Sequence, residues 1–381
     1  MFDRRAAVLA SMVLLAVFVA DGQANSSGLL HTTDTLSEGR YSFDATALGT
    51  TAFFAGGRRT GTDIRSNVVD IYDATTGLWS TQVLSQRRSG AVGAAVGNKV
   101  IFAGGRQSSG LASNVVDIYD AATGAWSTHT LSEARHGLSA TTVGNKAIFA
   151  GGYNGADCTS VVDIYDAETG LWSTDTLSQA RMRLCATTVG NKAFFAGGDD
   201  GWYSNVVDVY DAETGLWSTD TLSQPRMYLS ATTVGNKALF AGGTASTGYS
   251  DVVDIYDVDT GLWSFDTLSE GRFQLAATAV GNYAMFAGGY NGADYSSVVD
   301  IYNADTGLWS TDMLSEGRYW LCGTTVGGKA MFAGGFSRDA AWTGYSSNVV
   351  DIYVVPEPIT VFSGLIGVGM IGAYVRRRGV G

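Results

Sequence analysis

Ala193–Gly198 (AFFAGG) opens the unit that decides the fold, and Val206–Tyr210 (VVDVY) and Gly215–Trp217 (GLW) follow it at fixed distances. A Gly pair of the same kind begins at seven places, which are Gly56, Gly104, Gly151, Gly197, Gly242, Gly288 and Gly334. Successive pairs are 45 to 48 residues apart, and self-similarity at such a period is typical of a solenoid, a propeller or an array. Length alone would allow about two or three domains, but one continuous array of repeats takes precedence over that estimate.

Each unit contains four candidate strands. Leu184–Val189 (LCATTV) mixes small and β-branched residues, which suits an inner strand, and Lys192–Ala196 (KAFFA) has the apolar run of a strand buried on both faces. The Gly-Asn pair between them fits a type II′ hairpin. Val206–Tyr210 is the third strand, and Leu216–Thr221 is the fourth, after a turn rich in Asp and Gly. Four strands with short connections predict one antiparallel blade of an all-β propeller, without helices in the repeat region.

The number of blades follows from the two ends of the array. Seven Val-Val-Asp strands are present, and the last is Val349–Tyr353. Only six fourth strands follow them, and these contain Trp79, Trp126, Trp172, Trp217, Trp263 and Trp309. Leu29–Ser37 reads as a spare fourth strand at the other end. We therefore expect this N-terminal strand to complete the seventh blade, which closes the ring and removes a free sheet edge.

The repeats resemble kelch repeats in the spacing of three features. A double Gly closes the second strand, a Tyr follows on the third strand, and a Trp follows on the fourth, as in Gly151-Gly152, Tyr165 and Trp172. Seven copies in register span residues 29–353. The resemblance implies a seven-bladed kelch-type β-propeller, in which two sets of loops converge on one face around the channel entrance and hold a partner.

The first 24 residues read as a secretory signal peptide. Arg4 and Arg5 give a positive start, residues 6–20 form an apolar run, and Gly22–Ala24 offers small residues for cleavage. The apolar run is short for a spanning helix, which needs about 20 residues. We expect a cleaved signal helix over residues 1–24, and a retained anchor is the alternative.

The C-terminal segment, residues 355–378, resembles a PEP-CTERM sorting signal. A Pro-Glu-Pro motif precedes the uncharged residues 359–375, and a basic cluster follows them; the motif residues are Pro356, Glu357, Pro358, Arg376, Arg377 and Arg378. The resemblance implies a transmembrane helix, association with the membrane, and processing by an exosortase-type enzyme. An ordinary single-pass anchor with a chance Pro-Glu-Pro is the alternative.

Charged residues that recur once per repeat are first assigned to the fold. One Asp recurs on every third strand, at Asp70, Asp117, Asp163, Asp208, Asp254, Asp300 and Asp351. One Arg recurs before every inner strand, at Arg40, Arg88, Arg135, Arg181, Arg226, Arg272 and Arg318. We interpret them as structural partners, and the alternatives are calcium binding by the acids or anion attraction by the arginines. Cys158, Cys185 and Cys322 are odd in number, and we expect no disulfide.

Binding residues are sought where the repeats differ. Two positions vary, one after the double Gly and one after the recurrent Arg, and in kelch propellers both lie at the channel entrance. The predicted ligand-binding rim consists of Arg58, Arg106, Tyr153, Arg183, Asp199, Tyr228, Gln274, Tyr290, Tyr319, Trp320 and Phe336. Aromatic rings beside polar groups suit sugars or an extended peptide. Drift of unselected loops is the alternative.

No catalytic constellation is evident in the sequence. The chain has only three histidines, too few and too scattered for a His-rich metal site, and we expect no metal and no cofactor. The net charge of −12 argues against nucleic acid as a partner. The prediction is an exported, non-catalytic module that binds an extracellular glycan or surface protein, either membrane-anchored or released to the cell surface or extracellular matrix. The alternatives are a sugar-acting enzyme, mutarotase or oxidase-like, and a purely structural surface protein.

Overall fold

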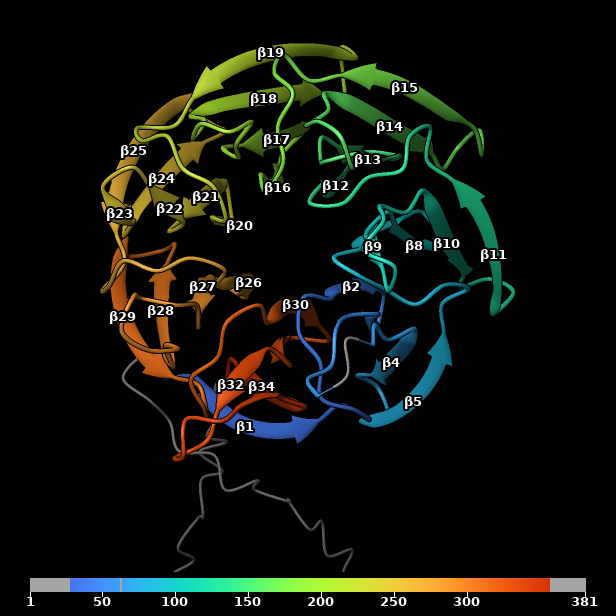
Figure 1. The fold of residues 1–381 in the computed structure, drawn as a ribbon. Coiled ribbons are helices and arrows are strands. Elements are labelled where there is room, and N and C mark those ends of the chain that lie inside the picture. The colour runs from blue at the N-terminus through green and yellow to red at the C-terminus, as the bar shows by residue number, and fades with distance from the viewer. Residues whose placement is uncertain (1–27, 62–63, 357–381) are drawn as a thin grey trace, which may run out of the picture.

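The computed structural model describes residues 28–61 and 64–356, which form seven four-stranded antiparallel sheets around a central axis (Figure 1). All regular elements in these ranges are β-strands. The prediction of a seven-bladed all-β propeller is therefore confirmed. The signal helix expected over residues 1–24 and the transmembrane helix expected in 355–378 fall on residues outside the described ranges. Within the described ranges, we found no helix with the length and hydrophobicity of a membrane span.

The two inner strands of every blade form a hairpin with the same register. The innermost strands are β2 (Asp44–Leu48), β7 (Val92–Val96), β12 (Ser139–Val143), β16 (Cys185–Val189), β20 (Ser230–Val234), β26 (Ala276–Val280) and β30 (Cys322–Val326). The second strands are β3 (Thr51–Ala55), β8 (Lys99–Ala103), β13 (Lys146–Ala150), β17 (Lys192–Ala196), β21 (Lys237–Ala241), β27 (Tyr283–Ala287) and β31 (Lys329–Ala333). Their last four residues are buried in all seven blades, as expected for strands covered on both faces.

The two outer strands of each blade form a second hairpin. The third strands are β4 (Val68–Asp73), β10 (Val115–Asp120), β14 (Val161–Asp166), β18 (Val206–Asp211), β24 (Val252–Asp257), β28 (Val298–Asn303) and β34 (Val349–Val354). The outermost strands are β5 (Leu78–Val83), β11 (Ala125–Thr130), β15 (Trp172–Thr176), β19 (Leu216–Thr221), β25 (Leu262–Thr267), β29 (Leu308–Met313) and β1 (Leu30–Thr35). In blade 4, Asp211 Oδ1 accepts backbone hydrogen bonds in the connecting turn, which is the turn chemistry that the sequence predicts.

The N-terminal strand closes the ring. β1 pairs antiparallel with β34 over six residues, from Leu30 opposite Val354 to Thr35 opposite Val349, so the first and last strands lie side by side in one sheet (Figure 1). His31 occupies the place that Trp has in the other blades, stacking on Tyr353 at 4.4 Å and bonding to Asp351. The predicted closure of the seventh blade by the N-terminal segment is confirmed.

Hydrophobic clusters hold each blade to the next. Seven such clusters occur, one between each pair of neighbouring blades including the seventh and the first. Between blades 4 and 5, for example, Phe194 of β17 packs with Phe240 of β21 and Tyr256 of β24. A single blade cannot bury both of its faces, so the ring folds as a unit.

The recurrent Arg and Asp residues form buried ion pairs, one per blade. All seven arginines have no exposed surface. In blade 4, the Arg181 guanidinium bonds to the Asp208 carboxylate and to the carbonyl oxygens of Phe195 and Gly197. The other carboxylate oxygen of Asp208 accepts a hydrogen bond from the backbone amide of Ser178, which precedes blade 4 in the chain. The structural interpretation of these residues is confirmed, and these arginines do not reach the channel mouth.

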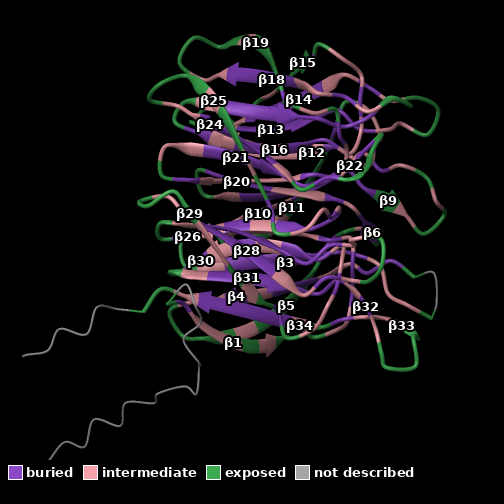
Figure 2. Cartoon of the chain, turned by 90° about the vertical axis from the view of Figure 1, so that its left-hand side faces the viewer, coloured by how far each residue is buried: buried purple, intermediate pink, exposed green. Residues whose placement is uncertain are grey.

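The loops that distinguish one blade from another lie on a single face of the disc. The short strand pairs β6 (Arg88–Ser89) with β9 (Arg106–Gln107), β22 (Thr244–Ala245) with β23 (Gly248–Tyr249), and β32 (Phe336–Arg338) with β33 (Gly344–Ser346) belong to these loops. Figure 2 shows β6, β9, β22, β32 and β33 together on one side. We call this side the loop face. The strand β34 starts at the loop face and ends at Val354 on the opposite face.

Candidate functional site

Seven equivalent residues, one from each blade, meet at the centre of the loop face. Each lies two positions after the buried arginine, and each has a positive φ between 54° and 66°: Ser42, Gly90, Gly137, Arg183, Tyr228, Gln274 and Trp320. We call these seven residues the loop ring. This left-handed conformation is unusual for residues other than Gly, yet five of the seven carry a side chain.

Backbone hydrogen bonds run around the loop ring from blade to blade. Six bonds with N···O distances of 2.8–3.1 Å join neighbouring members; for example, the amide of Tyr228 donates to the carbonyl of Arg183, and that of Gln274 donates to Tyr228. The positive φ orients these groups along the ring instead of into a blade. The backbone of the loop ring is therefore held by the same hydrogen bonds in most blades, while its side chains differ from blade to blade.

A second set of loop residues pairs with the first behind the loop ring. In every blade, the residue after the double Gly forms a β-bridge with the residue that precedes the ring member; the pairs are Tyr41–Arg58, Ser89–Arg106, His136–Tyr153, Met182–Asp199, Met227–Thr244, Phe273–Tyr290 and Tyr319–Phe336. The two loop sets thus lie against each other in all seven blades.

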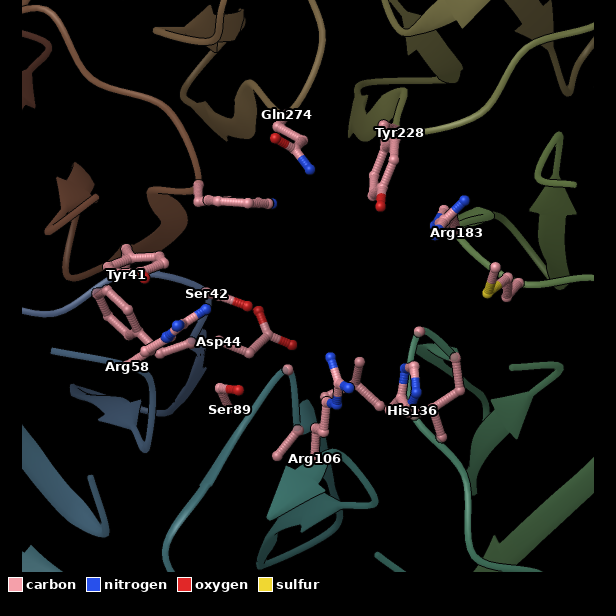
Figure 3. Close-up of a pocket in the computed structure, with 18 of the residues that line it drawn as sticks. Tyr41, Ser42, Asp44, Arg58, Ser89, Arg106, His136, Arg183, Tyr228 and Gln274 are labelled. Carbon is pink, nitrogen blue, oxygen red and sulfur yellow. The ribbon is translucent and has the colours of Figure 1, made fainter. Parts of the chain in front are cut away.

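The loop ring surrounds a cavity of about 470 Å³. This volume lies within the range of about 300–1,000 Å³ that small-molecule sites occupy. Figure 3 shows side chains of Arg58, Arg106, Arg183, Tyr228 and Gln274 around one central space. These residues come from blades 1, 2, 4, 5 and 6, so no single blade makes the site.

Positive charge collects on the side of the cavity formed by blades 1 to 4. Arg58, Arg65, Arg106 and Arg183 line it, and Arg183 also contacts the Asp199 carboxylate at 3.3 Å. Burial lowers the pKa of His136, and the charges of Arg106 and Arg183 lower it further. Both arginines therefore lie close enough to His136 to oppose protonation of its imidazole.

Among the described residues, Asp44 is the one acidic side chain that lines the cavity. Its carboxylate accepts hydrogen bonds from the amide of Gly93 at 2.7 Å and from its neighbour Ala45 at 2.9 Å. Burial nevertheless raises the pKa of Asp44 to about 6, because removal of water from the carboxylate outweighs these two bonds.

Aromatic side chains collect on the opposite side, from blade 5 through blade 7 to the start of blade 1. Nine rings contact one another in a continuous group, which we call the aromatic cluster: Tyr41, Tyr228, Tyr249, Phe273, Tyr290, Tyr295, Tyr319, Trp320 and Phe336. Trp320 stacks with Tyr319 at 4.7 Å and with Tyr41 at 5.6 Å. The loop face is therefore divided into a cationic side and an aromatic side.

Comparison with protein families agrees with this architecture. Residues 42–224 match the model described as the KLHDC2/KLHL20/DRC7 kelch-repeats domain, and residues 354–378 match the PEP-CTERM protein-sorting motif. The chain is a kelch-repeat β-propeller with a PEP-CTERM sorting motif. Such a motif indicates an exported protein that associates with the membrane or cell surface and is processed by an exosortase. No curated protein matched the chain.

The kelch propeller places six of the eleven predicted rim residues in the cavity wall, which are Arg58, Arg106, Arg183, Tyr228, Gln274 and Trp320. The other five lie on the loop face without lining this cavity. Tyr290, Tyr319 and Phe336 belong to the aromatic cluster, Tyr153 packs on His136, and Asp199 is buried against Arg183. The motif residue Pro356 is the last described residue, while Glu357, Pro358, Arg376, Arg377 and Arg378 lie outside the described ranges.

Two charged residues of the cavity, Asp44 and Arg65, were not predicted. The signal for Asp44 was present, since the other inner strands of the kelch propeller begin with Val, Ser, Cys or Ala. Arg65 lies at the end of a variable loop and has no counterpart by which its place could be inferred. Among the described residues, no group of three or more potential metal-binding side chains was found.

Asp44 provides a pH-dependent test of the site. Its folded-state pKa is raised, so its contribution favours folding below about pH 4 and is lost as the pH rises through 6. Asp44→Ser, which introduces the residue found at Ser139 and Ser230, is expected to become more stable relative to the native chain as the pH rises from about 3.5 to 7.5, by at most about 3 kcal/mol. Calorimetry of both chains measures this difference, and parallel stability curves would contradict it.

Proposed function

We propose that this exported kelch propeller is a non-catalytic module that binds an extracellular glycan or surface protein through the loop-face cavity. The observation that carries the proposal is the left-handed backbone of Arg183, Tyr228, Gln274 and Trp320. A non-Gly residue in this conformation costs roughly 1–2 kcal/mol. Gly90 and Gly137 show that the loop ring accepts Gly. Large side chains at strained positions support a role in recognition over unselected drift.

The direction of the cavity also supports a role outside the cell. The sorting motif follows directly after β34, and the end of β34 lies on the face opposite the loop face. A propeller attached through this segment would present its cavity away from the membrane. Such an orientation suits a partner in the surrounding medium.

One observation favours a second candidate, a sugar-acting enzyme. Asp44 lies in the cavity with a pKa of about 6, which is suitable for general acid–base chemistry. Both of its carboxylate oxygens, however, accept backbone hydrogen bonds from the cavity wall. This arrangement favours a structural role for Asp44 and supports binding over turnover. Release of a new product from any bound sugar would favour the enzyme.

A glycan array and a pull-down of surface proteins with the purified chain test the proposal. We expect specific binding by the native chain and its loss in Tyr228→Ala and Trp320→Ala, which line the cavity. Trp202→Ala is the matched control, because Trp202 is 84 % exposed and does not line it. Absence of any specific partner would support a purely structural surface protein instead.

The proposed strain at Tyr228 can be measured without a ligand. Tyr228→Gly and Tyr228→Ala both remove the ring, but only Gly adopts φ = 56° without steric cost. After allowance for the greater entropy of unfolded Gly, we expect the Gly variant to be more stable than the Ala variant by roughly 0.5–1 kcal/mol. Urea unfolding measures the difference, and an Ala variant of equal or greater stability would show that the position is unstrained.

A further inference from the structure

Building on the proposed binding function, we infer that the cavity takes an acidic saccharide, whose carboxylate lies between Arg106 and Arg183. The ligand class is thus an oligosaccharide that contains uronic acid units.

The charge of the cavity is opposite to that of the protein. The chain carries a net charge of −12, and seven of its arginines are buried in blade ion pairs. The cavity wall nevertheless contains four arginines against Asp44, and Asp199 pairs with one of them. Among the described residues that line the cavity, arginines therefore outnumber carboxylates. An acidic protein with a cationic cavity attracts anions to that cavity in particular.

Arg106 and Arg183 have donors left for a ligand. Arg106 donates from Nε to the carbonyl of Gly110 at 2.8 Å, and Arg183 uses Nη1 for Asp199. Within the described residues, Nη1 and Nη2 of Arg106 and Nη2 of Arg183 make no further hydrogen bond to protein. Figure 3 shows Arg58, Arg106 and Arg183 on different sides of one space. The two free terminal nitrogens of Arg106 suit bidentate binding of a carboxylate.

Gln274 adds a requirement that a simple anion does not meet. Its side chain lines the cavity and is 8 % exposed, and its Oε1 accepts no hydrogen bond from the described protein. A buried acceptor without a donor costs free energy, so the ligand should bring an O–H or N–H group as well as a carboxylate. The hydroxyls of Ser42 and Ser89 line the same cavity. The site therefore matches a ligand with both hydroxyl and carboxylate groups.

A uronic acid unit carries these groups on one rigid ring. An acidic peptide carries its carboxylates on flexible side chains, and ordering each of them reduces affinity. The apolar faces of sugar rings also suit the aromatic side of the cavity, formed by Tyr228 and Trp320. The compact cavity and its two-sided lining favour the saccharide, and the peptide becomes an outcome of the test.

Isothermal titration of the full chain in detergent tests the inference. The probes are tetragalacturonate, an alginate tetramer, the methyl ester of tetragalacturonate, neutral maltotetraose and a tetraglutamate peptide. We expect at least one uronate tetramer to bind, and the methyl ester and maltotetraose to bind at least tenfold more weakly. Arg106→Gln and Arg183→Gln should each weaken uronate binding at least tenfold. Arg87→Gln is the charge-matched control, since Arg87 is exposed and outside the cavity wall, and it should bind like the native chain.

The outcomes separate this inference from the proposed function. Equal binding of the ester and the free acid, or an unchanged affinity in both arginine variants, would overturn the acidic class. Binding of the peptide without either uronate tetramer would overturn the saccharide. If no uronate binds while the array finds another glycan or protein, the inference fails and the proposed function stands. If nothing binds in either experiment, both fail.

Discussion

Deleting Leu29–Thr35 is expected to unfold the propeller. The deletion removes β1, which pairs with β34 over six residues, and Leu29, which is fully buried. Each lost hydrogen bond contributes about 1 kcal/mol and the burial of Leu29 about 2 kcal/mol, so the total is on the order of 5 kcal/mol or more. Since domains are stable by only about 5–15 kcal/mol, the deleted chain should lose its cooperative thermal transition and aggregate through the exposed edge of β34.

A circular permutant distinguishes the missing strand from the altered N-terminus. In this variant, the turn sequence of Asp211–Gly215 joins Val354 to Leu29, which keeps the buried Leu29 and makes the seventh blade continuous like the other six. We expect its melting temperature to lie within a few degrees of the native value, because the strand pairing is unchanged. A deleted chain as stable as the permutant would show that β1 does not hold the ring closed.

Arg181→Met is expected to destabilise the protein by about 3–5 kcal/mol. The substitution leaves the Asp208 carboxylate buried without its cation, and removal of one partner of a buried ion pair carries this cost. It also leaves the carbonyl oxygens of Phe195 and Gly197 without the guanidinium donor. Burial lowers the pKa of Arg181, and the charge of Asp208 opposes that effect. Chemical denaturation of the native and variant chains measures the loss.

Lys192→Met provides the control in the same blade. Lys192 pairs with Asp211 at 2.6 Å, and both side chains are partly exposed, so its removal should cost less than about 1 kcal/mol. A similar loss in the two variants would mean that the buried pair contributes no more than a surface pair. A large loss in Arg181→Met alone supports the buried ion pair as a main stabilising contact within each blade.

The architecture could be predicted from the sequence because each blade repeats the same physical requirements. Seven Gly pairs, seven third strands and six Trp strands specified the blade number, and the spare segment beginning at Leu29 specified closure. An Arg equivalent to Arg181 and an Asp equivalent to Asp208 occur in every repeat, and this recurrence indicated a structural role for both. Repetition converts weak local signals into a strong one.

The cavity could be predicted only in part. The variable positions identified Arg183, Tyr228, Gln274 and Trp320. Their left-handed backbone conformation could not be inferred, because in a sequence only Gly indicates a positive φ. Gly90 and Gly137 were the only sequence signs of a shared positive φ. Asp44 differs from its counterparts by its charge, but only the structure shows that its strand begins in the cavity wall. Predicted residues such as Tyr290 lie outside the cavity because they pack with other aromatic rings.

We propose that the side chains of the loop ring recognise a ligand, while the backbone of the loop ring stabilises the fold. The most direct measurement replaces the five residues that carry side chains with Gly, namely Ser42, Arg183, Tyr228, Gln274 and Trp320, and compares this variant with the native chain on the same glycan array and protein pull-down. We expect a melting temperature within a few degrees of the native value and complete loss of the specific binding shown by the native chain. Binding by the variant at the native level would contradict it.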